Sequence, residues 1–159
     1  INVGVMTNSL ASNNHTAVYP SYKKYRRPLI EGGVKMFETS ASGGSRNPGL
    51  RTTLHTKAFM VDSRWLFVGS LNVDPRSIDI NTEMGIILDA PEFVVELRRR
   101  LDESVTQYAY RVEISSDGKV QWRHKIFGEE EVVHKEPEST WWMRFKSGLY
   151  GILPLESQL

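Results

Sequence analysis

Residues 54–70 limit the fold of this chain more than any other stretch, because they have the pattern of a β-hairpin. Two runs rich in strand-forming residues, 54–61 and 65–70, flank the polar tripeptide Asp62-Ser63-Arg64. Such runs, separated by a few polar residues, are typical of two antiparallel strands joined by a tight turn. We therefore expect a hairpin here, with Asp62 stabilising its turn.

The first strand of this hairpin carries two side chains suited to phosphate chemistry. His55 and Lys57 are two positions apart and leave the same face of a strand, whereas Asp62 faces away from His55. A lysine can stabilise charge on phosphodiester oxygens while a histidine supplies a lone pair. Ser70 and Asn72 also share a face, and their hydroxyl and amide can hydrogen-bond the same phosphate oxygens. Taken alone, an H-x-K triplet is more often an ordinary pair of surface residues.

The complete string is more specific, since it reads H-x-K-x4-D-x6-G-S-x-N from His55 to Asn72. It resembles the signature of the phospholipase D superfamily. In that family a carboxylate that orients the catalytic histidine commonly follows, in the place where this chain has Asn81 and Glu83, and such a pairing stabilises the imidazolium. We expect Glu83 to have this role, the alternative being a solvated strand residue. The implied site consists of the catalytic His55, Lys57 and Glu83, the phosphate-binding Ser70 and Asn72, and the structural Asp62 and Gly69.

Three further stretches, residues 7–11, 25–34 and 153–159, resemble the bacterial cardiolipin synthase branch of this superfamily. The resemblance runs from end to end and implies the carboxy-terminal half of such an enzyme, of the type without amino-terminal membrane spans. The implied fold class is α/β, an α/β/α sandwich with a mixed β-sheet. In the family this fold is duplicated, so that two motif-bearing halves meet at one active site.

The resemblance also implies a mechanism. One histidine attacks phosphorus to form a phosphohistidine, and the other protonates the departing alkoxide and then activates the acceptor, without a metal or another cofactor. In cardiolipin synthases the donor is a phospholipid and the acceptor is the glycerol headgroup of phosphatidylglycerol. The order of motifs in the family favours His55 as the acid/base of the pair, and the residues leave open whether it is the nucleophile.

The chain departs from the family pattern because it carries a single motif. A second histidine has to come from a missing amino-terminal half or from a second copy in a homodimer. The chain begins at Ile1 within a strand-like run, which favours a fragment of a longer protein, and an isolated fragment can be inactive. Two alternatives remain: a homodimeric nuclease or phosphodiesterase of the same superfamily, and a non-catalytic half that completes another subunit's site.

Composition narrows these alternatives only slightly. With 159 residues and a formal net charge of +1, the chain is long enough for one substantial core, and we expect one domain. The near-neutral charge neither requires nor excludes nucleic acid. The absence of cysteine excludes disulfides and thiolate zinc sites, and no apolar run is long enough for a membrane span. The other histidines, His15, His124 and His134, lack a lysine two positions later and are predicted to be surface residues.

The last part of the chain favours a lipid partner over nucleic acid. Residues 140–155 are dense in aromatic and aliphatic side chains and carry two cations, which suits a bilayer interface. We therefore divide the chain into a catalytic half-domain, residues 1–123, and a C-terminal tail, residues 124–159. Phospholipids, phosphatidylglycerol among them, and the surface of the inner bacterial membrane are the expected partners. The alternative is a tail that packs on its own domain or on a missing part of the protein.

Periodicity predicts two helices. Residues 19–31 have Tyr22, Tyr25 and Leu29 on an apolar stripe, and their basic residues are expected on a solvated face, with lipid or nucleic-acid contact as the alternative. The second helix follows Asp89, which is expected to cap it, and extends to residue 108. Strands are expected at residues 1–7, 34–38, 82–88, 110–114 and 119–123, a turn at 74–77, and solvated charges at 98–100 and 129–131.

Overall fold

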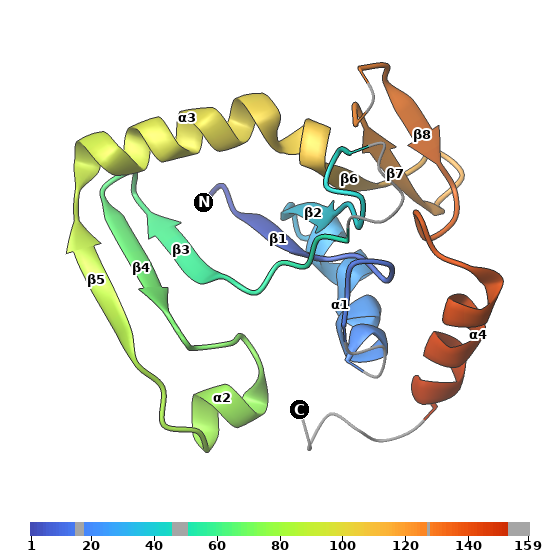
Figure 1. The fold of residues 1–159 in the computed structure, drawn as a ribbon, viewed down its shortest axis with the longest axis horizontal. Coiled ribbons are helices and arrows are strands. Elements are labelled where there is room, and N and C mark those ends of the chain that lie inside the picture. The colour runs from blue at the N-terminus through green and yellow to red at the C-terminus, as the bar shows by residue number, and fades with distance from the viewer. Residues whose placement is uncertain (15–17, 46–50, 127, 153–159) are drawn as a thin grey trace. The chain divides into compact units, whose positions relative to one another are not determined.

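The computed structural model describes residues 1–14, 18–45, 51–126 and 128–152. These residues form two compact units (Figure 1). Among the described residues, one unit combines Ile1–Leu54 with residues 106–152, and the other is His55–Val105. Among the described residues, the strands of the second unit pair only with one another.

The first unit is built on a sheet of five strands in the order β1-β2-β6-β7-β8. β1 pairs with β2 in parallel and the other neighbours are antiparallel, so the expected α/β fold with a mixed sheet is confirmed. Residue 123, expected as the end of the catalytic half-domain, lies inside β7, and β8 extends the same sheet beyond it. The strands are β1 (Gly4–Asn8), β2 (Lys35–Thr39), β6 (Ala109–Ile114), β7 (Val120–His124) and β8 (Glu131–Val133).

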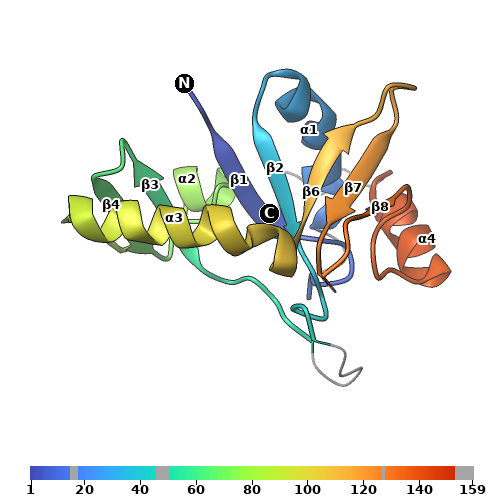
Figure 2. The same cartoon turned by 90° about the horizontal axis from the view of Figure 1, so that it is seen from above.

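Helices α1 (Tyr19–Glu31) and α4 (Trp141–Tyr150) also belong to the first unit. α1 contacts β2 and β6, and α4 contacts α1 (Figure 2). Part of the predicted tail is thus a helix, which Thr140 caps by accepting a hydrogen bond from the N–H of Met143 at 3.2 Å.

The core of this unit lies on the face of the sheet that α1 covers. Met36, Val112 and Trp122 occupy paired positions on three adjacent strands and are almost fully buried. Tyr22 and Ile30 of α1 pack against this group. Side chains in register across a sheet share a face, so a single helix can cover all three.

The apolar stripe predicted for α1 is only partly correct. Tyr22 packs on the core, but Tyr25 is 53% exposed and Leu29 is 36% exposed. The buried residues of the helix are Tyr19 and Arg26. A pattern of apolar residues does not reveal this face, because Arg26 is buried only through the acidic side chains that meet it from other elements.

The second unit contains an antiparallel sheet of three strands in the order β3-β4-β5. The strands are β3 (Lys57–Val61), β4 (Trp65–Gly69) and β5 (Gly85–Asp89). Along the chain, the helix α2 (Pro75–Asp79) lies between β4 and β5, and the helix α3 (Pro91–Tyr108) follows β5. The predicted hairpin of β3 and β4 is confirmed, but its first strand begins at Lys57 and not at residue 54, so His55 lies outside it. At its turn, Asp62 and Ser63 have φ angles of 51° and 53°, and the N–H of Arg64 donates to the Val61 carbonyl at 3.1 Å. Two successive positive φ angles match the twist of hairpin strands, and aspartate tolerates this conformation.

Two local predictions for this unit are wrong. Residues 74–77, expected as a turn, contain the start of α2, which Asp74 caps by accepting a hydrogen bond from the N–H of Ser77 at 2.7 Å. Asp89 ends β5 and binds Arg64 through hydrogen bonds of 2.7 and 2.6 Å instead of capping α3. The pairing of β4 with β5 brings these two side chains together, and a local pattern does not contain that pairing.

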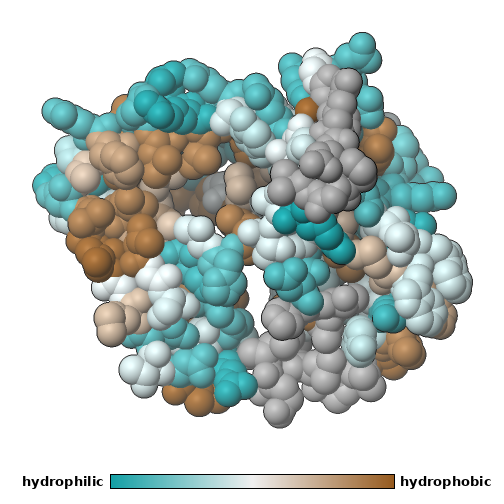
Figure 3. Space-filling view, viewed as in Figure 1, coloured by the Kyte–Doolittle hydropathy of each residue, from teal (hydrophilic) through white to brown (hydrophobic). Residues whose placement is uncertain are grey.

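Apolar side chains gather on the surface of the second unit, over its strands (Figure 3). They include Phe59, Val61, Trp65, Val68, Ile86, Ile87 and Leu88. The arginines of α3 are exposed, as predicted, and form ion pairs along the same helix. These pairs join Arg98, Arg99 and Arg100 to Glu96, Asp102 and Glu103.

The histidines outside the motif differ in burial. His134 is exposed, as predicted, and so are residues 129–131, whereas His15 lies outside the described residues. The prediction for His124 is wrong, since it is 5% exposed and its Nδ1 accepts a hydrogen bond from the N–H of Ile126 at 3.3 Å. Its ring packs edge-on against Tyr110, because β7 lies inside the sheet between β6 and β8. No helix in the described part of the chain combines the length and apolar character needed to cross a bilayer.

Candidate active site

Five of the residues predicted for the site lie at one end of the three-stranded sheet: His55, Lys57, Gly69, Ser70 and Glu83. β3 begins at Lys57, β4 ends at Gly69 and β5 begins at Gly85, and these three residues pair across the sheet. Ser70 follows Gly69 directly, and Glu83 precedes Gly85 by two positions. Antiparallel pairing therefore collects groups that are separated along the chain.

His55 and Lys57 contact each other at this end of the sheet. The Nζ of Lys57 lies 2.9 Å from Nε2 of His55 and also donates to the His55 carbonyl oxygen at 2.9 Å. The contact places a histidine ring nitrogen beside the Nζ of a lysine, and these are the two kinds of group that phosphodiester chemistry uses.

Glu83 binds Ser70, and the described residues show no hydrogen bond between Glu83 and His55. The Ser70 hydroxyl donates to the Glu83 carboxylate and accepts from the N–H of Met84 at 3.0 Å. The side-chain amide of Asn81 donates to the same carboxylate at 3.4 Å. The backbone pairing of Ser70 with Met84, 2.8 Å from N to O, explains why this serine is the group within reach.

The carboxyl group of Glu83 is held in its charged form. Hydrogen bonds from Ser70 and Ser77, with smaller contributions from Asn81 and the positive charge of Lys57, keep the pKa of Glu83 below its usual range. Glu83 therefore acts at neutral pH as a fixed anion that orients the Ser70 hydroxyl. Lys57 lies close enough to Glu83 for its positive charge to help lower the pKa of that carboxyl group.

Gly69 is a tight packing position. A Cβ atom there would lie 2.4 Å from the carbonyl oxygen of Met84 and 2.7 Å from the Phe67 ring. A Cβ on its partner Gly85 would lie 2.2 Å from the same ring, which stacks on Phe59 with 4.7 Å between the centroids. The two glycines leave room for this ring beside the site, and the sequence pattern did not identify Gly85.

Asn72 and Asp62 lie apart from this cluster of hydrogen bonds. Asn72 is exposed in the loop after β4, and its side chain has no hydrogen-bond partner among the described residues. Asp62 is at the turn, at the opposite end of the β3–β4 hairpin from Lys57. Within the described ranges, no three His, Asp or Glu side chains are grouped so that they could hold a metal ion.

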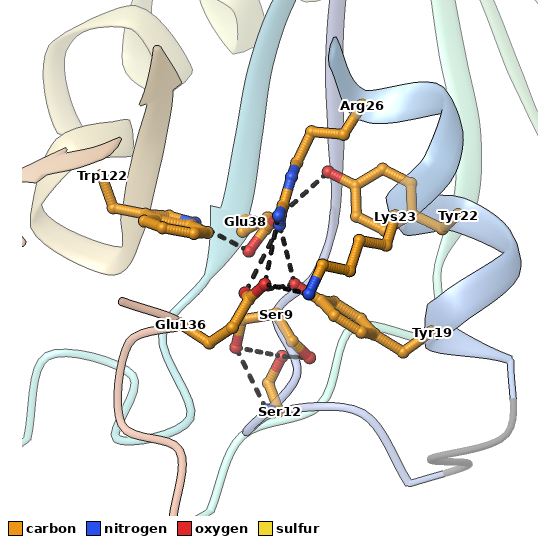
Figure 4. Close-up of polar contacts among 9 residues, drawn as sticks. All are labelled: Ser9, Ser12, Tyr19, Tyr22, Lys23, Arg26, Glu38, Trp122 and Glu136. Carbon is orange, nitrogen blue, oxygen red and sulfur yellow. Dashed lines mark hydrogen bonds and ion pairs between the residues drawn. The ribbon is translucent and has the colours of Figure 1, made fainter. Parts of the chain in front are cut away.

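A second polar cluster, which the sequence pattern did not reveal, is buried in the first unit (Figure 4). The guanidinium of Arg26 binds Glu38 at 2.9 Å and Glu136 at 3.1 Å. The indole N–H of Trp122 donates to Glu38 at 3.0 Å, and the Tyr19 hydroxyl donates to Glu136. These groups point toward one another, and they join α1, β2, β7 and the segment before α4. We assign the cluster a structural role.

The pKa values of Glu38 and Glu136 are shifted in opposite directions. Burial raises the pKa of Glu38, and the charge of Arg26 opposes that effect. Burial would also raise the pKa of Glu136, but hydrogen bonds and charge from Arg26, together with Lys23 at 3.3 Å, outweigh it and lower the pKa. The buried charges are thus compensated within the unit.

Comparison with known proteins finds similarity to cardiolipin synthases over most of the chain. The family model described as "Cardiolipin synthase, PLD-like domain" matches residues 1–105. Cardiolipin synthase C of Escherichia coli (strain K12) is 30% identical over 166 residues, which cover 98% of this chain and 35% of that protein. An uncharacterized protein of Helicobacter pylori (strain ATCC 700392 / 26695) is 29% identical, covering 97% of this chain and 31% of that protein. Cardiolipin synthase A of Proteus mirabilis (strain HI4320) is 30% identical, covering 73% of this chain and 21% of that protein. The chain spans about a third of the length of the relatives that match nearly all of it.

Proposed function

The chain belongs to the cardiolipin synthase branch of the phospholipase D superfamily, and on that basis we propose that it forms half of the active site of a phosphatidyltransferase. The substrates are phospholipids, with phosphatidylglycerol as the acceptor. The observation that carries the proposal is the contact of 2.9 Å between His55 Nε2 and Lys57 Nζ.

The reaction proceeds in two displacements at phosphorus. A histidine nitrogen attacks the phosphodiester of the donor, a P–N bond forms, and the P–O bond to the departing alcohol breaks. A second histidine supplies the proton that the alkoxide takes up, and then removes the proton of the acceptor hydroxyl as that oxygen displaces the histidine. His55 is one of these two histidines, and Lys57 stabilises the charge on the non-bridging oxygens.

The other site residues support the phosphate. Ser70 and Asn72 are proposed to bind its oxygens, and Asn72 has a side chain without a partner among the described residues. Glu83 keeps the Ser70 hydroxyl in place through its hydrogen bond. The orienting role that the family assigns to this carboxylate toward His55 remains a proposal, and it requires a side-chain movement from the arrangement seen here.

A second histidine motif completes the site. It comes from another segment of the complete protein or from a second copy of this chain. The relatives are about three times as long as the match to this chain, which supports the first source. Light scattering on an active preparation distinguishes the two, because a monomer with full activity excludes the second copy.

The enzyme is proposed to work peripherally at the inner membrane of a bacterium, with α4 facing the lipid. Trp141, Phe145 and Leu149 of α4 are 67%, 50% and 56% exposed, and they recur at a spacing of four positions. The rings of Trp141 and Phe145 stack at 5.4 Å, and Lys146 lies 5.1 Å from the ring centre of Trp142. Exposed aromatic rings beside a cation favour the headgroup level of a bilayer.

The proposed function is tested with a His55→Ala variant of the complete protein. Transfer between labelled phosphatidylglycerol molecules in mixed micelles should fall by at least about a thousandfold, the scale on which removal of a reacting histidine acts. Folding should be unaffected, because His55 is exposed. His134→Ala is the matched control, since His134 is also exposed and followed by a lysine, and it should retain activity. Transfer that survives His55→Ala would overturn the proposal.

A further inference from the structure

The segment that leads into His55 is attached to other parts of the first unit although it belongs to no strand. The Thr53 hydroxyl donates to the carbonyl of Ser12 at 2.7 Å. The N–H of Thr52 donates to the carbonyl of Ala41 at 2.7 Å. Residues 52 and 53 are therefore held in place by hydrogen bonds to distant segments.

Asn8, the last residue of β1, makes the next attachment along this segment, at Leu54. Its Nδ2 donates to the Leu54 carbonyl at 2.7 Å, and its Oδ1 accepts from the Leu54 N–H at 2.8 Å. One amide side chain thus satisfies both backbone groups of Leu54, as a neighbouring strand would.

The amide of Asn8 is itself held in one orientation. Its Oδ1 also accepts hydrogen bonds from the hydroxyls of Ser12 at 3.2 Å and Thr39 at 3.3 Å. Ser12 is 2% exposed and Thr39 is 9% exposed, so water does not compete freely for these bonds. Because Oδ1 of Asn8 accepts from three donors, the amide cannot flip without losing them, and Nδ2 therefore faces the Leu54 carbonyl.

The Leu54 carbonyl is part of the peptide group that connects Leu54 to His55. A peptide group is planar, so a bond that fixes the Leu54 oxygen also fixes the directions to N and Cα of His55. We propose that Asn8 is a positioning residue for His55, which sets the direction in which the imidazole leaves the backbone. The inference rests on the proposed function, since it assumes that His55 reacts at the phosphate.

The first test is an Asn8→Ala variant of the complete enzyme. Its kcat should fall by about 10- to 100-fold with KM nearly unchanged, as expected when a reacting group is misplaced by about 1 Å. The thermal midpoint should change little, because Thr52 and Thr53 keep the segment attached. Hydrogen exchange should be faster at the Leu54 amide, which loses its acceptor.

The second test separates positioning from a general loss of packing, and it uses Asn8→Asp. At neutral pH the introduced carboxylate still accepts from the Leu54 N–H but cannot donate to the Leu54 carbonyl. Once protonated, it donates again. The ratio of kcat in Asn8→Asp to kcat in the wild type should therefore rise as the pH falls through the titration of this carboxyl. If Asn8→Ala does not fold, the pH dependence of this ratio tests the positioning role of Asn8 by itself.

Asn14→Ala is the matched control. Asn14 is exposed, and its Oδ1 accepts from the Thr53 hydroxyl at 3.2 Å, so the variant loosens the same segment without touching the Leu54 peptide. It should retain wild-type kcat. An equal loss of kcat in Asn14→Ala, a wild-type kcat in Asn8→Ala, or a ratio for Asn8→Asp that does not change with pH would each overturn the role of Asn8. Transfer that survives His55→Ala would instead overturn the proposed function.

Discussion

Replacement of Arg26 by methionine tests the buried cluster that joins α1 to the five-stranded sheet. The side chains of Arg26, Glu38 and Glu136 are 4%, 0% and 6% exposed. The methionine would leave two buried carboxylates without the cation between them. Lys23, which is 50% exposed and 3.3 Å from Glu136, can compensate only one of them.

The expected loss of stability is large. Removal of one partner from a buried ion pair costs about 3–5 kcal/mol, because the remaining charge stays buried without compensation. The total free energy of unfolding of a domain is roughly 5–15 kcal/mol, so Arg26→Met should remove a large share of it. For a unit of this size, a loss of about 3 kcal/mol lowers the melting temperature by more than about 10 °C.

A triple variant separates the charge effect from the loss of contacts. Arg26→Met is combined with Glu38→Gln and Glu136→Gln, which removes all three charges together. The glutamines still accept hydrogen bonds from the indole N–H of Trp122 and the hydroxyl of Tyr19. Since an isosteric neutral replacement of a buried ion cluster is often tolerated, the triple variant should recover most of the lost stability.

Urea unfolding followed by far-ultraviolet circular dichroism measures both effects. Arg27→Met is the control: Arg27 is 46% exposed and pairs with the exposed Glu31, so its loss should leave the midpoint nearly unchanged. A cost for Arg26→Met below about 1 kcal/mol, the range of surface pairs, would refute the buried cluster. A triple variant no more stable than Arg26→Met would refute the argument from uncompensated charge.

Two further predictions concern the second unit and α4. Gly69→Ala should lower the melting temperature and abolish transfer, because its Cβ would lie 2.4 Å from the carbonyl oxygen of Met84. Gly148→Ala is the control: it lies in α4 with nothing within 4 Å of its Cβ, so it should leave the melting temperature unchanged or raise it slightly, and a loss equal to that of Gly69→Ala would contradict the packing argument. Combined replacement of Trp141 and Phe145 by alanine should weaken sedimentation with anionic phospholipid vesicles by at least about tenfold, given the area of two aromatic rings. Tyr108→Ala, at a residue that is 54% exposed on α3, should leave that binding unchanged, and an equal loss would argue against a specific role of α4.

Some features of this protein depend only on residues close together in the sequence, and these were predictable. The turn at Asp62 and Ser63 forms because a polar tripeptide separates two strand-forming runs, and both residues have the positive φ that such a turn uses. His55 and Lys57 are two positions apart in the sequence, and the structure brings their Nε2 and Nζ atoms within 2.9 Å, although β3 begins only at Lys57. The motif that indicated the family lies in the same short stretch.

Other features depend on which segments pair in space. Glu83 binds Ser70, 13 positions away, because β4 and β5 are neighbours. Arg26 is buried because Glu136, 110 positions away, reaches it. In the same way, Asn8 holds Leu54 over 46 positions. A periodic pattern reports the faces of one element, whereas the partner of a polar side chain is chosen by the packing of several elements, and only the tertiary structure decides it.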